Sequence, residues 1–169
     1  MTRRQILAAV FGMFMTVIAW AGAPSIPLQD LDGRARNVNE FIGHDKWVIV
    51  VTWSHDCRIC DREIDEMATF HAAHHEKQAM VLGVTLDGAE HHKEARAFVK
   101  RHKLPFVNLI TEPSQEVMMK FGAGKFVGTP TYYVYDPKGE IVGQNIGPLT
   151  RAEVEEFIRS FDKAPQNDK

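Results

Sequence analysis

Two continuous apolar runs with a helical pattern between them restrict the fold more than any other feature of this sequence. Trp47–Trp53 reads WVIVVTW and Met80–Leu86 reads MVLGVTL. Each run is short and rich in β-branched residues, as in strands that are covered on both faces of a sheet. From Ile59 to about Glu76, apolar positions recur every three or four residues, which predicts a helix. Strand, helix and strand in this order predict a right-handed parallel unit.

The segments around this unit predict further alternation of strands and helices, and hence an α/β domain. They are a hairpin at Leu28–Asn37, a helix at Glu90–His102, a strand at Phe106–Ile110, a helix at Pro113–Gly122, and strands at Thr131–Tyr135 and Glu140–Gln144. Thr150 and Glu153 have capping-box spacing, so a last helix is predicted from there to about Phe161.

The composition fits one compact globular domain, with 44% apolar and 25% charged residues in 169. We place this domain at residues 26–163 and treat 164–169 as a polar tail. The formal net charge is -2, and lysines and arginines are scattered among the acids. Such a charge pattern offers no basic surface for phosphates, so nucleic acid is not an expected partner.

The first residues have the pattern of an export signal. Arg3 and Arg4 precede Ile6–Ala23, a run of 18 residues without a charge. Small residues in Ala19-Trp20-Ala21 match a signal peptidase site, so Met1–Ala21 is predicted to be a cleaved signal peptide. A retained anchor is the alternative, because 18 apolar residues approach the length of a membrane span. The domain is then expected in the periplasm, or tethered to the periplasmic face of the inner membrane.

The chain has two cysteines, and they form the motif Cys57-Arg58-Ile59-Cys60 between a predicted strand and a predicted helix. A cysteine at a helix N-terminus faces free amide groups, which favour its thiolate. Arg58 and a protonated His55 add positive charge and are expected to lower the pKa of Cys57 further. These features predict that Cys57 is the attacking thiol and that Cys60, one turn further in, resolves the mixed disulfide.

Two other interpretations of the cysteine pair carry less weight. A purely structural disulfide would close a very short loop, which stabilises a fold by only about 2 kcal/mol before strain. A metal site would need two further ligands, and no second cysteine pair is present. The eight histidines are explained by solvated helix positions, so no metal is expected.

With these segments, the chain resembles the thioredoxin-fold family and, more narrowly, its exported, often membrane-tethered branch typified by TlpA and ResA. The resemblance covers about Ile26 to Phe161. The matching segments are Asp30-Leu31-Asp32-Gly33, Phe41-Ile42-Gly43, Thr52-Trp53-Ser54, Gly128-Thr129-Pro130-Thr131 and Tyr135-Asp136-Pro137-Lys138-Gly139. It implies a mixed central sheet flanked by helices, with an N-terminal β extension and an inserted helix and strand at Ala89–Ile110.

The resemblance also implies a function. The chain would be an exported thiol-disulfide oxidoreductase that needs no cofactor, acts as a monomer and reduces extracytoplasmic protein disulfides, as in cytochrome c or copper-site assembly. A membrane thiol carrier would supply the electrons. Thr129 and Pro130, with a cis bond between them, and Trp53 are the substrate-binding residues implied.

Glu63 is the candidate for handling the proton of Cys60. It lies three residues after Cys60 on the helix face that carries Met67, so its carboxylate is predicted to point toward the core. Burial would raise its pKa enough for proton exchange. The alternative is a solvated first-turn glutamate that interacts with the helix dipole.

The motif departs from the resembled branch at three places. The spacer Arg58-Ile59 lacks a proline, Asp65 stands where many relatives have a proline, and Ser54-His55-Asp56 separates Trp53 from the first cysteine. Spacer residues help to set thiol pKa and reduction potential, so the direction of electron transfer depends on them.

Two other functions use the same cysteines. A peroxiredoxin-like thiol peroxidase needs a serine or threonine three residues before the nucleophile, which Ser54 provides, but Val50 stands where a proline is required. A copper-binding chaperone would hold the metal with Cys57 and Cys60 instead of exchanging disulfides.

Overall fold

The structure is a computed structural model that describes residues 22–122 and 124–163. The predicted signal peptide or anchor at 1–21 and the polar tail at 164–169 lie outside the described residues. Within the part that is described, no helix combines the length and the apolar character needed to cross a membrane.

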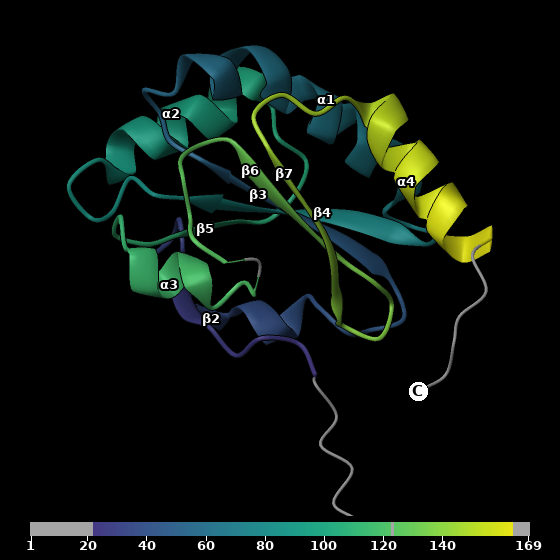
Figure 1. Cartoon of the computed structure of the whole chain (residues 1–169). Coiled ribbons are helices and arrows are strands. Elements are labelled where there is room, and N and C mark those ends of the chain that lie inside the picture. Colours follow the sequence, from purple (N-terminus) through teal and green to yellow (C-terminus); the bar gives the residue numbers. More distant parts are fainter. Residues whose placement is uncertain (1–21, 123, 164–169) are drawn as a thin grey trace, which may run out of the picture.

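In the part of the chain that the structure describes, seven strands form one mixed sheet in the order β2-β1-β5-β4-β3-β6-β7 (Figure 1). The neighbours β3, β4 and β5 run parallel, and the other pairs are antiparallel. The strands are β1 (Pro27–Asp30), β2 (Ala35–Asn37), β3 (Trp47–Trp53), β4 (Ala79–Thr85), β5 (Asn108–Ile110), β6 (Thr131–Tyr135) and β7 (Ile141–Ile146). The predicted α/β class with a mixed central sheet is confirmed.

Helices cover both faces of the sheet. They are the α-helices α1 (Arg58–His74), α2 (His92–His102), α3 (Gln115–Met119) and α4 (Arg151–Lys163), and the short 3-10 helix η1 (Val38–Glu40). Figure 1 shows α1, α2 and α4 on one face, with α3 and η1 on the other. All seven β3 residues are buried, because alternate side chains enter one of two hydrophobic clusters, one on each face. This explains the unbroken apolar run in the sequence.

The predicted elements are confirmed, with small shifts at their ends. The inserted unit is α2 and β5, and β5 pairs on one side with β4 and on the other with the N-terminal hairpin. The third helix is shorter than predicted. Ser114 caps α3, and after Met119 the chain continues in three-residue turns up to Gly122, which has φ +92°. Glu140 belongs to the turn before β7, since its carbonyl accepts the N–H of Asp136 at 2.9 Å.

The start of α4 is held by two side chains. Glu153 accepts the main-chain N–H of Thr150 at 2.8 Å, and the Thr150 hydroxyl accepts the N–H of Glu153 at 3.3 Å. The predicted capping box is therefore present. In addition, Glu66 of α1 accepts the N–H of Arg151 at 2.9 Å, which joins α4 to the helix that carries the cysteines.

Candidate functional site

The cysteine pair lies where β3 passes into α1. Cys57 is the N-cap of α1, and its sulfur accepts the main-chain N–H of Cys60 at 3.1 Å. The two cysteines are joined in a disulfide. Cys57 is half-buried, whereas Cys60 is 1% exposed. The predicted position at a helix N-terminus is confirmed, and Cys57 is the sulfur that a second protein can reach.

A cis proline faces this disulfide. The Thr129–Pro130 peptide bond is cis, as predicted, and the carbonyl oxygen of Thr129 lies 3.5 Å from Sγ of Cys57. The loop is anchored from behind, because the Thr52 hydroxyl accepts the N–H of Thr131 and donates to its carbonyl, both at 3.0 Å. Anchoring at the first residue of β6 holds the preceding Thr129 beside the sulfur.

Thr129 also leaves a main-chain donor available. Among the described residues, nothing accepts a hydrogen bond from its N–H. A backbone N–H and C=O that are free of the sheet can pair with an extended segment of another chain. Such a segment would lie alongside Cys57, so binding and disulfide exchange would occur on the same edge.

Charged groups of both signs surround Cys57. Arg58 is exposed on the first turn of α1. Asp56 is also exposed, and the Ser54 hydroxyl donates to it at 2.8 Å, which holds the pKa of this carboxyl below its usual range. Arg58 and the helix dipole favour a thiolate at Cys57, and Asp56 opposes it. Tuning of the Cys57 pKa by Arg58 and His55 stays a prediction.

His55 is held by Asp87, a residue that the sequence analysis did not single out. Nδ1 of the His55 ring lies 2.6 Å from Oδ1 of Asp87, and the main-chain N–H of His55 donates to both Asp87 oxygens at 3.1 Å. Asp87 follows β4 as His55 follows β3, and β3 and β4 are parallel neighbours. The carboxyl ends of adjacent parallel strands meet at one edge, which is the signal that could have indicated this pair.

Glu63 lies on α1, one turn after Cys60, and is half-buried. Burial raises the pKa of Tyr132, and the charges of Glu63 and Glu66 raise it further. Cys60, one turn before it on the same helix, is buried. Its part in proton transfer stays a prediction.

Trp53 differs from its predicted role. Its side chain is 0% exposed, stacks on Phe98 of α2 with ring centroids 4.4 Å apart, and donates from Nε1 to Asn108 at 3.1 Å. The indole thus has no free surface for a substrate, and the predicted substrate contact does not fit its position. Trp53 fixes the inserted α2 and β5 against the strand that leads to the cysteines.

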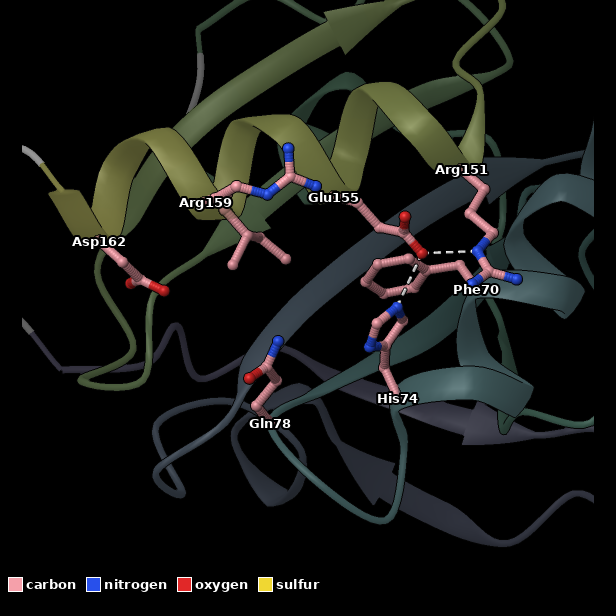
Figure 2. Close-up of a pocket in the computed structure, with 8 residues that line it drawn as sticks. Phe70, His74, Gln78, Arg151, Glu155, Arg159 and Asp162 are labelled. Atoms are coloured by element: carbon pink, nitrogen blue, oxygen red, sulfur yellow. Dashed lines mark hydrogen bonds and ion pairs between the residues drawn. The ribbon is translucent and has the colours of Figure 1, made fainter.

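The histidines divide into different environments. His55, Asp56 and Asp87 offer ligand atoms within 4.8 Å of one another and form the one such group among the described residues. His71 is buried and accepts the N–H of Val81 at 3.1 Å. Figure 2 shows His74 in a separate recess between α1 and α4, where it contacts Glu155 at 2.9 Å.

Comparison with known proteins agrees with this architecture. Residues 21–144 match the model of the AhpC/TSA family. Thiol-disulfide oxidoreductase ResA of Bacillus thuringiensis subsp. konkukian (strain 97-27) is 26% identical over 139 residues, which cover 82% of this chain and 76% of the relative. Sporulation thiol-disulfide oxidoreductase A of Bacillus subtilis (strain 168) is 24% identical over 164 residues, covering 89% of this chain and 95% of the relative.

Solved structures show the same fold. The crystal structure of a DsbF homologue from Corynebacterium diphtheriae superposes with a TM-score of 0.71 and 20% identity, covering 91% of this chain and 97% of that chain. The thioredoxin domain of a thiol-disulfide oxidoreductase from Bacteroides vulgatus gives a TM-score of 0.67 at 24% identity, covering 84% of this chain and 96% of that chain. The implied thioredoxin fold, with its N-terminal β extension and inserted helix and strand, is thereby confirmed.

Proposed function

Because the chain belongs to the AhpC/TSA family, we propose that this thiol-disulfide oxidoreductase is exported and reduces disulfides in extracytoplasmic proteins. The observation that carries the proposal is the position of Cys57, half-buried at the N-terminus of α1 with its sulfur 3.5 Å from the carbonyl oxygen of Thr129. A substrate strand paired with Thr129 would bring its own disulfide to this sulfur.

The reaction has two exchange steps. The thiolate of Cys57 attacks the substrate disulfide, so that one substrate sulfur joins Cys57 and the other is released with the bonding electron pair. Cys60, deprotonated with the help of Glu63, then attacks Cys57. This step forms the Cys57–Cys60 disulfide and releases the second substrate sulfur. Two electrons have moved to the substrate, and a membrane dithiol carrier would return them to the pair.

Cytochrome c precursors and copper-site assembly proteins are the proposed substrate class, because they present cysteines outside the cytoplasm. No cofactor takes part in these steps, since the two sulfur atoms of Cys57 and Cys60 are oxidised as the two sulfur atoms of the substrate disulfide are reduced. We propose a monomer, since a single chain supplies both cysteines and the Thr129 edge.

Activity on three substrates tests the proposal. The reduced protein should reduce the disulfides of insulin rapidly, consume peroxide slowly and fail to hold copper against a competing chelator. Slow peroxide turnover is expected because the Ser54 hydroxyl donates to Asp56 and Val50 replaces the proline that a peroxidase needs. A protein that consumes peroxide faster than it reduces insulin would be a peroxidase, and stable copper binding would favour the chaperone.

The direction of electron flow and the export need their own measurements. A redox titration of the Cys57–Cys60 couple should give a potential below that of glutathione, and a potential above it would mean an oxidant. An alkaline phosphatase fused after Asp30 should be active in a bacterial host, because Met1–Ala21 directs export. An inactive fusion that stays in the cytoplasm would contradict the proposed location.

A further inference from the structure

The pair of His55 and Asp87 has a geometry that its structural role alone does not require. Asp87 has a side chain only 2% exposed. Its carboxylate accepts the main-chain N–H of His55, and Nδ1 of the His55 ring lies 2.6 Å from Oδ1. The hydroxyl of Thr85 donates to the same carboxylate at 2.5 Å. An ionised carboxylate only accepts hydrogen bonds, so Nδ1 of the ring carries a hydrogen. The nitrogen left for proton transfer is Nε2.

The loop that carries Asp87 is itself held in place. Gly88 has φ +61°, and a Cβ at this position would lie 2.2 Å from a carboxylate oxygen of Glu112. The other oxygen of Glu112 accepts the N–H of Ala89 at 2.9 Å. Glycine is favoured here because φ is positive, and a Cβ would also push aside the carboxylate of Glu112. This arrangement keeps Asp87 at the end of β4 and fixes the orientation of the His55 ring.

His55 and Thr129 line the same recess, which also contains Ser54 and Asp56. Thr129 is the residue whose carbonyl oxygen lies 3.5 Å from Sγ of Cys57. A substrate strand that pairs with Thr129 and forms a mixed disulfide with Cys57 would therefore pass along the recess into which His55 faces. The sulfur that leaves the substrate disulfide would be released there.

We propose that His55, oriented by Asp87, is the general acid and base for the substrate's own thiol. This inference rests on the proposed function and adds a second proton-transfer site to it. When Cys57 attacks the substrate disulfide, the protonated ring gives its Nε2 proton to the departing substrate sulfur, which leaves as a thiol. In the reverse reaction the neutral ring accepts the proton of an incoming substrate thiol. Glu63 serves Cys60, and His55 serves the substrate.

Several titratable groups face His55 and belong to its pH dependence. The ring of His91, the residue before α2, lies with its centroid 4.9 Å from that of His55. Asp56 lies in the same loop, and Glu90 and Glu112 line the recess from the β4–α2 and β5–α3 connections. The protonated ring is the form that donates the proton, so these neighbouring charges act on the contribution of His55.

Comparing two disulfide substrates distinguishes proton transfer to the departing substrate sulfur from a change in the reactivity of Cys57. An alkyl disulfide in a cystine peptide releases a basic thiolate that needs a proton, whereas a nitro-substituted aryl disulfide releases a stable thiolate that does not. Single-turnover oxidation of the reduced protein is measured with both substrates across pH. In His55→Gln the rate with the alkyl disulfide should fall by about 100-fold, the low end for general acid catalysis, and the rate with the aryl disulfide should stay within about threefold.

Asp87→Asn is the second variant, because it keeps the size of the side chain while removing its charge. It should reduce the ratio of alkyl to aryl rates in the same direction as His55→Gln, since the ring loses its fixed tautomer. His74→Gln is the matched control: His74 is also half-buried and paired with a carboxylate, Glu155, but lies at the far end of α1 (Figure 2). Its rate ratio should equal that of the wild type.

The outcomes are distinct. A fall of more than about fivefold in the ratio of alkyl to aryl rates in His55→Gln, with the wild-type pH dependence removed, supports the proposal. Equal losses of rate with both substrates would mean that His55 acts on the reactivity of Cys57. A change in the rate ratio below this threshold would mean that the pair of His55 and Asp87 is only structural. Either result overturns the proposal. A wild-type protein inactive on both disulfides would refute the proposed function itself, before any variant is compared.

Discussion

Glu63 is the residue proposed to accept the proton of Cys60. It is half-buried one turn after Cys60, and its charge acts on the buried phenol of Tyr132. The side chain is half-buried, so it is not sealed from water. Its orientation toward the core and its exchange of a proton with Cys60 stay predictions.

Glu63→Gln is expected to leave the fold intact and to slow disulfide exchange by up to about 100-fold, because Cys60 loses its proton acceptor. The rate is followed against pH with insulin as the substrate. Glu66→Gln is the control: Glu66 lies on the same helix but accepts the N–H of Arg151, so its loss should lower stability without changing the pH profile. An unchanged profile in Glu63→Gln would leave Glu63 as a charge at the helix end.

His71 should make stability depend on pH. Its ring accepts the N–H of Val81, and burial, followed by the charges of His75 and Lys46, lowers its pKa to about 4. The unfolded chain binds this proton near pH 6.5, and the folded chain does not. The free energy of unfolding should therefore fall by roughly 3 kcal/mol as pH drops from about 7 to about 4.

Urea unfolding of the oxidised protein at several pH values measures this effect. His71→Gln should show a weaker fall in stability over the same pH range, because the titrating group is gone. In His75→Gln the pH dependence of the wild type should persist, since His75 is exposed and stacks on the His71 ring from outside. Parallel curves for wild type and His71→Gln would show that folding does not lower the pKa of His71.

Among the elements, the inserted α2 and β5 connect most directly to the site. Trp53 ends β3, and its indole is held by Phe98 of α2 and by Asn108 of β5. The end of α2 also reaches α1, where His102 contacts Asp61 and Asp65 at 3.0 Å. Asp65 occupies the position of a proline in many relatives, and here its carboxylate joins the insertion to the helix of the cysteines.

Gly83 of β4 pairs with Asn108 of β5. A Cβ at this position would lie 2.0 Å from Oδ1 of Asn108, the atom that accepts the Trp53 N–H. Gly83→Ala is therefore expected to destabilise the fold by about 1 to 3 kcal/mol through overpacking and to shift the tryptophan fluorescence. Chemical unfolding measures the loss. Gly128→Ala is the control, since nothing lies within 4 Å of its added Cβ, and equal stability of both variants would contradict the close contact.

For the whole molecule, the site depends on segments far apart in the chain that the sheet brings together. Cys57 is the N-cap of α1, shortly after β3, and Thr129 precedes β6. Because β3 and β6 are antiparallel neighbours, the end of β3 lies beside the start of β6. The attacking sulfur and the edge that would bind a substrate strand therefore sit on the same rim of the sheet. Disulfide exchange and substrate recognition should be separable by mutation.

Cys60→Ser is expected to trap substrates as mixed disulfides on Cys57, because the resolving thiol is absent. Non-reducing electrophoresis of extracts from the exported fraction, followed by mass spectrometry, identifies the trapped proteins. Adding Pro130→Ala should change which proteins are held while leaving the sulfur intact. Adducts that also form in Cys57→Ser would arise elsewhere and would contradict the assigned nucleophile.

Local pattern alone was enough to determine the elements and the place of the cysteines. The buried runs, the helical periodicity and the capping box at Thr150 and Glu153 depend on neighbours within a few residues, so the sequence determined β3, α1, β4 and the N-terminus of α4. The cis bond at Pro130 came from the family resemblance, because base rates favour trans. Element ends shifted where turn hydrogen bonds, as at Glu140, compete with the pattern.

Only the tertiary structure decided which side chains meet at the cysteine pair. Asp87 is thirty-two positions from His55, and their contact exists because β3 and β4 lie in parallel register. Trp53 precedes the motif closely in sequence, yet it is buried because the inserted α2 and β5 cover it. Periodicity shows which face of an element is apolar, but the order of strands in the sheet determines what that face contacts.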